Sequence, residues 1–87
     1  MAYEIEWTAP ALRELRKLDQ QVARRVLAAI NRLAQDPRPV GARSLIGHPG
    51  GVTRLRVGDY RVIYQIEDNR LVVIVVRVAH RREVYRS

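Results

Sequence analysis

The chain has 87 residues, and 16 Lys and Arg against 9 Asp and Glu give it a formal net charge of +7. This length predicts one domain, residues 1–87, with a small core. There is no cysteine, and the two histidines lie far apart in the sequence. This composition excludes disulfides and thiolate metal sites and argues against zinc, so no metal and no cofactor are expected. No apolar stretch reaches membrane-spanning length and the N-terminus lacks signal-peptide features, so we expect a cytoplasmic protein that makes no membrane contact.

The first half of the chain predicts one strand followed by two helices. Residues 2–7 alternate apolar and acidic side chains, as in a half-buried strand. Thr8 can cap a helix over 9–18, whose leucines fall on one stripe. Asp19 can cap a second helix, which ends where the prolines of 36–39 forbid its continuation. Because almost no loop separates them, the two helices should form an antiparallel hairpin.

The second half predicts a loop and then a three-stranded meander. Residues 36–51 are rich in proline and glycine, as in a loop. Strands are predicted at 52–57, 60–66 and 71–79, with short turns between them. The last of these is almost continuously apolar, so it should be an interior strand covered on both faces. The order β-α-α-β-β-β predicts an α+β fold, with the helical hairpin packed on one face of a mostly antiparallel four-stranded sheet.

Strand alternation gathers arginines on one face of this sheet. Arg54 and Arg56 share a face of their strand, and Arg61 can point to the same side across the turn that follows. Arg77 of the last strand can join them, and Arg43 lies in the loop at one rim. A basic sheet face fits the major groove of a duplex poorly, but it can hold the phosphates of a single strand. The alternatives are a solvated arginine face or a surface for an acidic protein partner.

The stretch 80-HRREVYR-86 follows the last predicted strand and precedes the final Ser87. This ending, the stretch 54-RLRVGDYRVIYQIED-68 and the order of elements resemble the RelE branch of the RelE/ParE toxin superfamily over essentially the whole chain. The resemblance implies the toxin of a type II toxin–antitoxin pair, a ribosome-dependent endonuclease that cleaves messenger RNA in the ribosomal A site without a metal ion. It implies a cognate antitoxin, the ribosome and messenger RNA as partners, with operator DNA bound only through the antitoxin.

The resemblance also implies the residues of the site. Matched to the family's motifs, Arg61, Arg81 and Tyr85 are catalytic. Residue chemistry adds His80, because attack by a 2′-hydroxyl needs a proton acceptor and histidine is the nearby side-chain type that titrates near neutral pH. The RNA phosphates are expected to contact the remaining arginines of the sheet face, which are Arg43, Arg54, Arg56 and Arg77.

Two alternatives for the function stay open. Where the best-known RelE site has two lysines, this chain has Val52 and Arg54. A non-catalytic, ParE-like poison of DNA gyrase is therefore one alternative, and an inactive toxin that acts only in an antitoxin–operator complex is the other. Single residues have structural interpretations too: His80 as a surface histidine, Tyr85 as a tail-packing residue and Arg61 as half of a surface ion pair.

Overall fold

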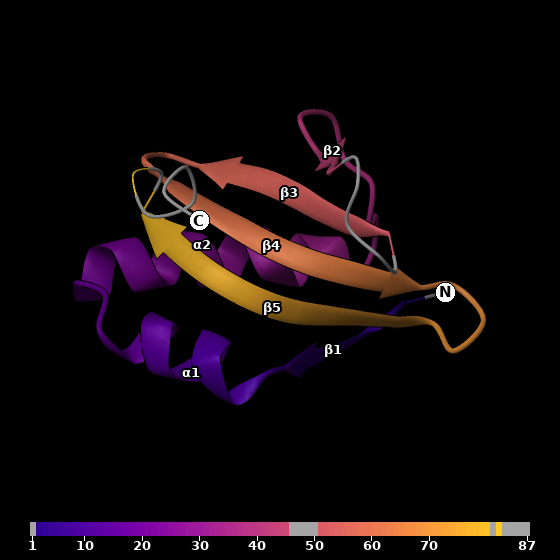
Figure 1. Ribbon diagram of the computed structural model, residues 1–87, viewed down its shortest axis with the longest axis horizontal. Coiled ribbons are helices and arrows are strands. Elements are labelled where there is room, and N and C mark those ends of the chain that lie inside the picture. Colours follow the sequence, from indigo (N-terminus) through magenta and orange to yellow (C-terminus); the bar gives the residue numbers. More distant parts are fainter. Residues whose placement is uncertain (1, 46–50, 81, 83–87) are drawn as a thin grey trace.

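The computed structural model describes residues 2–45, 51–80 and 82, which form two helices and one mixed sheet. The elements in chain order are β1 (Glu4–Trp7), α1 (Ala9–Arg16), α2 (Gln20–Leu33), β2 (Arg43–Ser44), β3 (Val52–Val57), β4 (Tyr60–Glu67) and β5 (Val72–His80). The strand order across the sheet is β1-β5-β4-β3-β2. Both helices lie on the same side of the twisted sheet (Figure 1). The predicted α+β class and the helical hairpin on one face are confirmed.

The sheet has one strand more than the four predicted. The additional strand β2 is only two residues long and lies inside the stretch predicted as a loop; Arg43 pairs with Arg54 and Ser44 with Thr53. Two residues are too few to show the alternation that marks a strand, which is why the sequence did not reveal it. The three predicted strands of the meander are present and antiparallel, whereas β1 pairs with β5 in parallel.

Local capping explains where the helices begin. The Thr8 hydroxyl accepts a hydrogen bond from the Ala11 amide at 3.2 Å, as an N-cap residue does. The same hydroxyl donates to the carbonyl of Val76 in β5 at 2.9 Å. At the start of α2, the Asp19 carboxylate accepts from the Gln21 amide at 3.1 Å. Thr8 therefore marks the start of α1 and also connects this helix to β5, the strand on which α1 packs.

The core lies between α2 and the helix-facing side of β4 and β5. The fully buried side chains with the largest volumes are Tyr64, Ile30, Leu33, Val26, Val62 and Val73. They interleave from three elements, so each element buries its apolar face against the other two. β5 lies between β1 and β4, which confirms its prediction as an interior strand.

A cluster of polar contacts holds the segment after α2 against the sheet. The Tyr64 hydroxyl donates to the Pro37 carbonyl at 2.8 Å inside the protein. On the protein surface, the Arg38 guanidinium donates to both carboxylate oxygens of Asp68, at 3.2 and 2.9 Å. The Tyr3 hydroxyl also donates to Asp68, at 2.7 Å. The hydrogen bond from Arg38, followed by that from Tyr3, lowers the pKa of Asp68 below its ordinary value of 3.8.

Asp68→Asn should make the protein less stable at neutral pH and no less stable in acid. A carboxyl whose pKa is lower in the folded state stabilises the fold above its unfolded pKa, and this contribution is lost as the pH falls through the folded pKa. Urea unfolding at pH about 6 and about 2.5 measures the difference between the variant and the wild type. Asp59→Asn, in the turn between β3 and β4, is the matched control. A difference of the same size at both pH values would show that the carboxylate's charge is not the cause.

Candidate nucleic-acid interface

Strand register places a first row of arginines across the helix-free face of the sheet. Arg43 of β2 lies opposite Arg54 of β3, Arg54 lies opposite Ile63 of β4, and Ile63 lies opposite Arg77 of β5. Residues directly opposite each other point to the same face, with their Cβ atoms about 5 Å apart. Like charges in this arrangement repel, so the Arg43–Arg54 pair is a feature that fold stability alone does not favour.

A second row lies next to the first, toward the turn between β3 and β4. Arg56 pairs with Arg61, and Arg61 pairs with Ala79 of β5. The turn at Gly58 and Asp59 brings the two arginines opposite each other; Gly58 has a φ of 60°, a left-handed conformation that costs glycine little. Two residues along a strand separate the rows by about 7 Å. The register therefore confirms that Arg54, Arg56 and Arg61 share the face without helices.

Arg61 differs from the prediction in its exposure. The side chain was expected on an open surface or in a surface ion pair, but the residue is only 2% exposed. Arg56 is exposed and Arg54 is half-buried. A guanidinium keeps its charge inside a protein, so Arg61 brings a positive charge with restricted side-chain freedom to the floor of the face.

Arg77 is held by a carboxylate from α1. Its Nε and Nη2 atoms donate to Oε2 of Glu14 at 3.0 and 2.6 Å, and Oε1 of Glu14 accepts from the Val78 amide at 2.8 Å. The pairing of β1 with β5 ends at Trp7 and Val75. Beyond that point, the Glu14 side chain, and not a neighbouring strand, accepts the hydrogen bond from the edge of β5. No sequence pattern links Glu14 to these partners, because they lie more than sixty positions away in the chain.

The opposite end of the same face is acidic. Glu4 of β1 and Glu67 of β4 both lie opposite Val72, and Glu6 lies opposite Ile74. Arg70 pairs with Glu6 at 3.7 Å and also with Glu67. The face is therefore polarised along its strands, and an anionic strand is attracted only to the end that carries the arginine rows.

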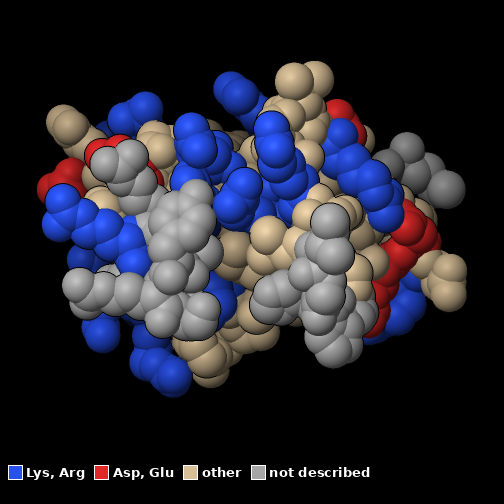
Figure 2. Space-filling model, turned by 45° about the horizontal axis from the view of Figure 1, so that its top comes forward, with Lys and Arg blue, Asp and Glu red and all other residues tan. Residues whose placement is uncertain are grey.

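Figure 2 shows how the charged side chains are distributed on one face of the molecule. Basic side chains gather over the middle of the view, and acidic side chains appear toward its two sides.

His80 lies on the other side of the sheet from the arginine rows. It is opposite Tyr60, and the two rings meet edge to face with centroids 5.3 Å apart. Together with Glu14, Lys17 and other residues they line a hollow of about 290 Å³ beside α1. The Nδ1 atom of His80 accepts from the Arg82 amide at 3.3 Å. The structure therefore does not bring the His80 ring together with the arginine rows, and its catalytic role stays a prediction.

Two of the predicted catalytic residues, Arg81 and Tyr85, lie outside the described residues. Within the described part of the chain, no group of three or more His, Cys, Asp or Glu side chains is placed to hold a metal ion. Neither helix in that part is long and apolar enough to cross a membrane. The arrangement that the described residues do provide is an array of fixed cations on a sheet face, suited to phosphate groups.

Comparison with known proteins agrees with this architecture. Residues 5–85 match the family model described as the ParE toxin of the type II toxin–antitoxin system parDE. The chain is 34% identical to "Toxin RelG" of Mycobacterium tuberculosis, over 99% of both sequences. It is 35% identical to "mRNA interferase toxin RelE" of Escherichia coli, over 98% of this chain and 92% of that protein.

Solved structures give the same result. The toxin chain of the RelBE2 toxin–antitoxin complex from Mycobacterium tuberculosis superposes with a TM-score of 0.81 at 30% identity, covering 92% of this chain and 99% of that one. The order of elements, the helix-free basic face and the similarity to these relatives all indicate the same family. The chain belongs to the RelE/ParE superfamily of type II toxin–antitoxin toxins.

Proposed function

We propose that this protein is a ribosome-dependent messenger-RNA endonuclease that works without a metal ion and stops translation by cutting the message in the ribosomal A site. The observation that carries the proposal is the pair of arginine rows on the helix-free face, with Arg61 buried at its floor. Relatives at about a third identity carry the name mRNA interferase and support the same activity. A sheet face of this kind suits a single strand, whose backbone and bases are both accessible.

The proposed reaction is an internal transfer of the phosphate. The 2′-hydroxyl oxygen attacks the adjacent phosphorus and loses its proton, the bond to the 5′-oxygen of the next nucleotide breaks, and that oxygen gains a proton. The products are a 2′,3′-cyclic phosphate and a free 5′-hydroxyl. Negative charge increases on the phosphate oxygens in the transition state, and preorganised guanidinium groups stabilise it there.

The residues divide between these tasks. We propose that Arg61 and Arg81 stabilise the transition state, that Tyr85 orients the substrate or stacks on a base, and that His80 is a candidate for proton transfer. Neighbouring phosphates would be bound by the remaining arginines of the face, Arg43, Arg54, Arg56 and Arg77. The contact with Glu14 means that Arg77 is the most constrained of these side chains.

The proposed partners follow from the same activity. We propose that a cognate antitoxin binds the toxin, as in the complexes described as RelBE toxin–antitoxin complexes, and that operator DNA is bound only through that antitoxin. The ribosome and the message are the targets, which implies action in the cytoplasm.

Poisoning of DNA gyrase is the second candidate function. The matching family model is that of a ParE toxin, and the chain has Val52 and Arg54 where the best-known RelE site has two lysines. A gyrase poison needs a binding surface but no proton acceptor, so the separation of His80 from the arginine rows is compatible with it.

Primer extension on a message translated in a reconstituted system tests the proposed function. The full-length protein should produce cuts at a fixed position within codons, and Arg81→Ala should weaken them. Loss of the cuts with His80→Ala would assign the proton transfer to this histidine, and their survival would remove it from the mechanism. An intact message with unimpaired protein synthesis would contradict the proposed activity.

A further inference from the structure

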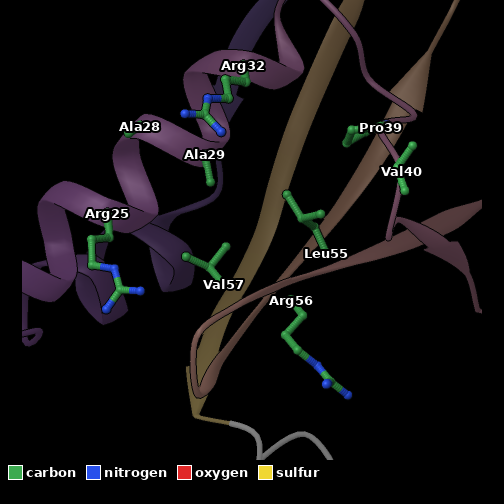
Figure 3. A pocket seen from close by; sticks show the side chains of 9 residues that line it. All are labelled: Arg25, Ala28, Ala29, Arg32, Pro39, Val40, Leu55, Arg56 and Val57. Atoms are coloured by element: carbon green, nitrogen blue, oxygen red, sulfur yellow. The ribbon is translucent and has the colours of Figure 1, made fainter.

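His80 is the last residue of β5, and its side chain lies on the side of the sheet that the helices cover. Figure 3 shows the two sides of the sheet at β3. Leu55 and Val57 point into a groove of about 410 Å³ beside α2, whereas Arg56 points away to the helix-free face. The His80 ring instead lines the hollow beside α1. The ring and the arginine rows therefore lie on opposite sides of the sheet.

The sheet offers few hydrogen-bond partners to the main chain beyond His80. Tyr60, its partner in the ladder, is the first residue of β4, and the pairing of β1 with β5 already ends at Val75. A main-chain amide that leaves a sheet needs another acceptor, such as water or a side chain. The Arg82 amide has one in the Nδ1 atom of His80, at 3.3 Å. This hydrogen bond reaches two residues along the chain, so donor and acceptor enclose Arg81 between them.

The contact has the form of an Asx turn, in which the side-chain oxygen of Asn or Asp accepts from the amide two residues further on. The Nδ1 atom of histidine is as many bonds from the backbone as the Oδ1 atom of asparagine, so it can close the same turn. The Tyr60 ring meets the His80 ring edge to face, with centroids 5.3 Å apart and planes at 83°, and this packing restricts the imidazole's rotation. A turn around Arg81 is therefore built into the end of β5.

The same hydrogen bond determines where the ring carries its proton. A neutral imidazole has one N–H, and the nitrogen that accepts a hydrogen bond is the one without the proton. Because Nδ1 accepts from the Arg82 amide, the proton of a neutral His80 belongs on Nε2. Neither nitrogen can then take the proton of a 2′-hydroxyl unless the contact with Arg82 is broken first. This state suits a ring that holds the chain in place.

We infer that His80 is a positioning residue: its Nδ1 atom holds the Arg82 amide and thereby sets how the chain that carries Arg81 leaves the sheet. The inference rests on the proposed function, because this placement affects cleavage only if Arg81 stabilises the transition state. The proton acceptor in the reaction is then a group other than His80.

Two substitutions of His80 separate positioning from proton transfer. Full-length His80→Asn keeps an acceptor for the Arg82 amide but cannot titrate near neutral pH, so it should cut a ribosome-bound message at close to the wild-type rate. His80→Leu has no acceptor and should cut about five- to tenfold more slowly, the factor that one ordinary hydrogen bond contributes. Single-turnover rates measure both. If His80 takes up the proton, both variants should instead lose the factor of about 10²–10⁴ that a general base supplies.

Such a loss in both variants would overturn the inference. Equal cleavage by His80→Leu and His80→Asn would overturn it too, because the contact with the Arg82 amide would then position nothing that the reaction uses.

Heteronuclear NMR of the full-length protein tests the contact without any RNA. At a pH where histidine is neutral, the His80 ring should carry its proton on Nε2. His80→Asn removes one of the chain's two histidines and so assigns the signal. The Arg82 amide should exchange with solvent more slowly in the wild type and His80→Asn than in His80→Leu. A proton on Nδ1, or equal exchange in the wild type and both variants, would contradict the inference. Failure of the ribonuclease proposal would appear as an intact message and would leave these NMR results unchanged.

Discussion

Replacing Arg61 by glutamine should lower the rate of message cleavage on the ribosome by about 10²–10³-fold, the loss typical when one preorganised group that stabilises transition-state charge is removed. Arg61 is 2% exposed and lies opposite both Arg56 and Ala79, so its charge is held in place before substrate arrives. Glutamine keeps hydrogen-bonding capacity but removes the charge. Single-turnover cleavage of a ribosome-bound message measures the effect.

Arg13→Gln on the exposed surface of α1 is the control for this substitution, because it makes the same change of charge away from the face. Circular dichroism and urea unfolding should show that Arg61→Gln remains folded at the assay temperature. Cleavage close to the wild-type rate by a folded Arg61→Gln protein would show that the buried guanidinium has no part in the chemistry.

Tyr64→Ala should lower the free energy of unfolding by about 3–5 kcal/mol, the range for truncating a buried aromatic side chain. Tyr64 is 0% exposed and packs among residues of α2, β4 and β5. Small domains are stabilised by only about 5–15 kcal/mol, so this loss would remove a large part of the total stability. Urea unfolding at 25 °C measures the change.

Tyr64→Phe separates the contribution of the ring to stability from that of the hydroxyl. Burial raises the pKa of the Tyr64 phenol to about 12, so the hydroxyl stays protonated and donates to the Pro37 carbonyl throughout the neutral range. Removing this hydrogen bond while keeping the ring should cost about 1 kcal/mol. A loss in Tyr64→Phe as large as that in Tyr64→Ala would mean that the tether to Pro37, and not core packing, is what Tyr64 contributes.

Strand alternation was sufficient to predict the sheet and most of its arginine face. The strand predicted at 52–57 is found with the same bounds, and the strands predicted at 60–66 and 71–79 differ from β4 and β5 by no more than one residue at each end. Alternation over six or more residues is a strong signal, because one face of each strand must be buried. The shared face of Arg54, Arg56 and Arg61 follows from the same signal and from the tight turn between β3 and β4.

Features that depend on contacts between distant parts of the chain were not predictable. The burial of Arg61 depends on contacts made in the folded protein, whereas alternation along β4 gives only the face on which the side chain lies. The contact between Glu14 and Arg77 joins a helix to the edge of a strand at the point where another strand ends. His80 was expected beside the arginines because it follows the strand predicted at 71–79, but it is the last residue of β5, and its position in the alternation turns its ring toward the helices.

Cleavage of ribosome-bound message tests most directly whether the arginine face is a ribonuclease site. One defined messenger RNA is given to the full-length protein either free or bound to ribosomes with an empty A site, and supercoiled DNA with gyrase is given to the same protein in parallel. We expect cuts in the ribosome-bound message alone, with 2′,3′-cyclic phosphate ends that Arg61→Gln largely abolishes. An intact message together with gyrase-dependent DNA breaks would contradict the ribonuclease assignment and make the basic face a gyrase-binding surface.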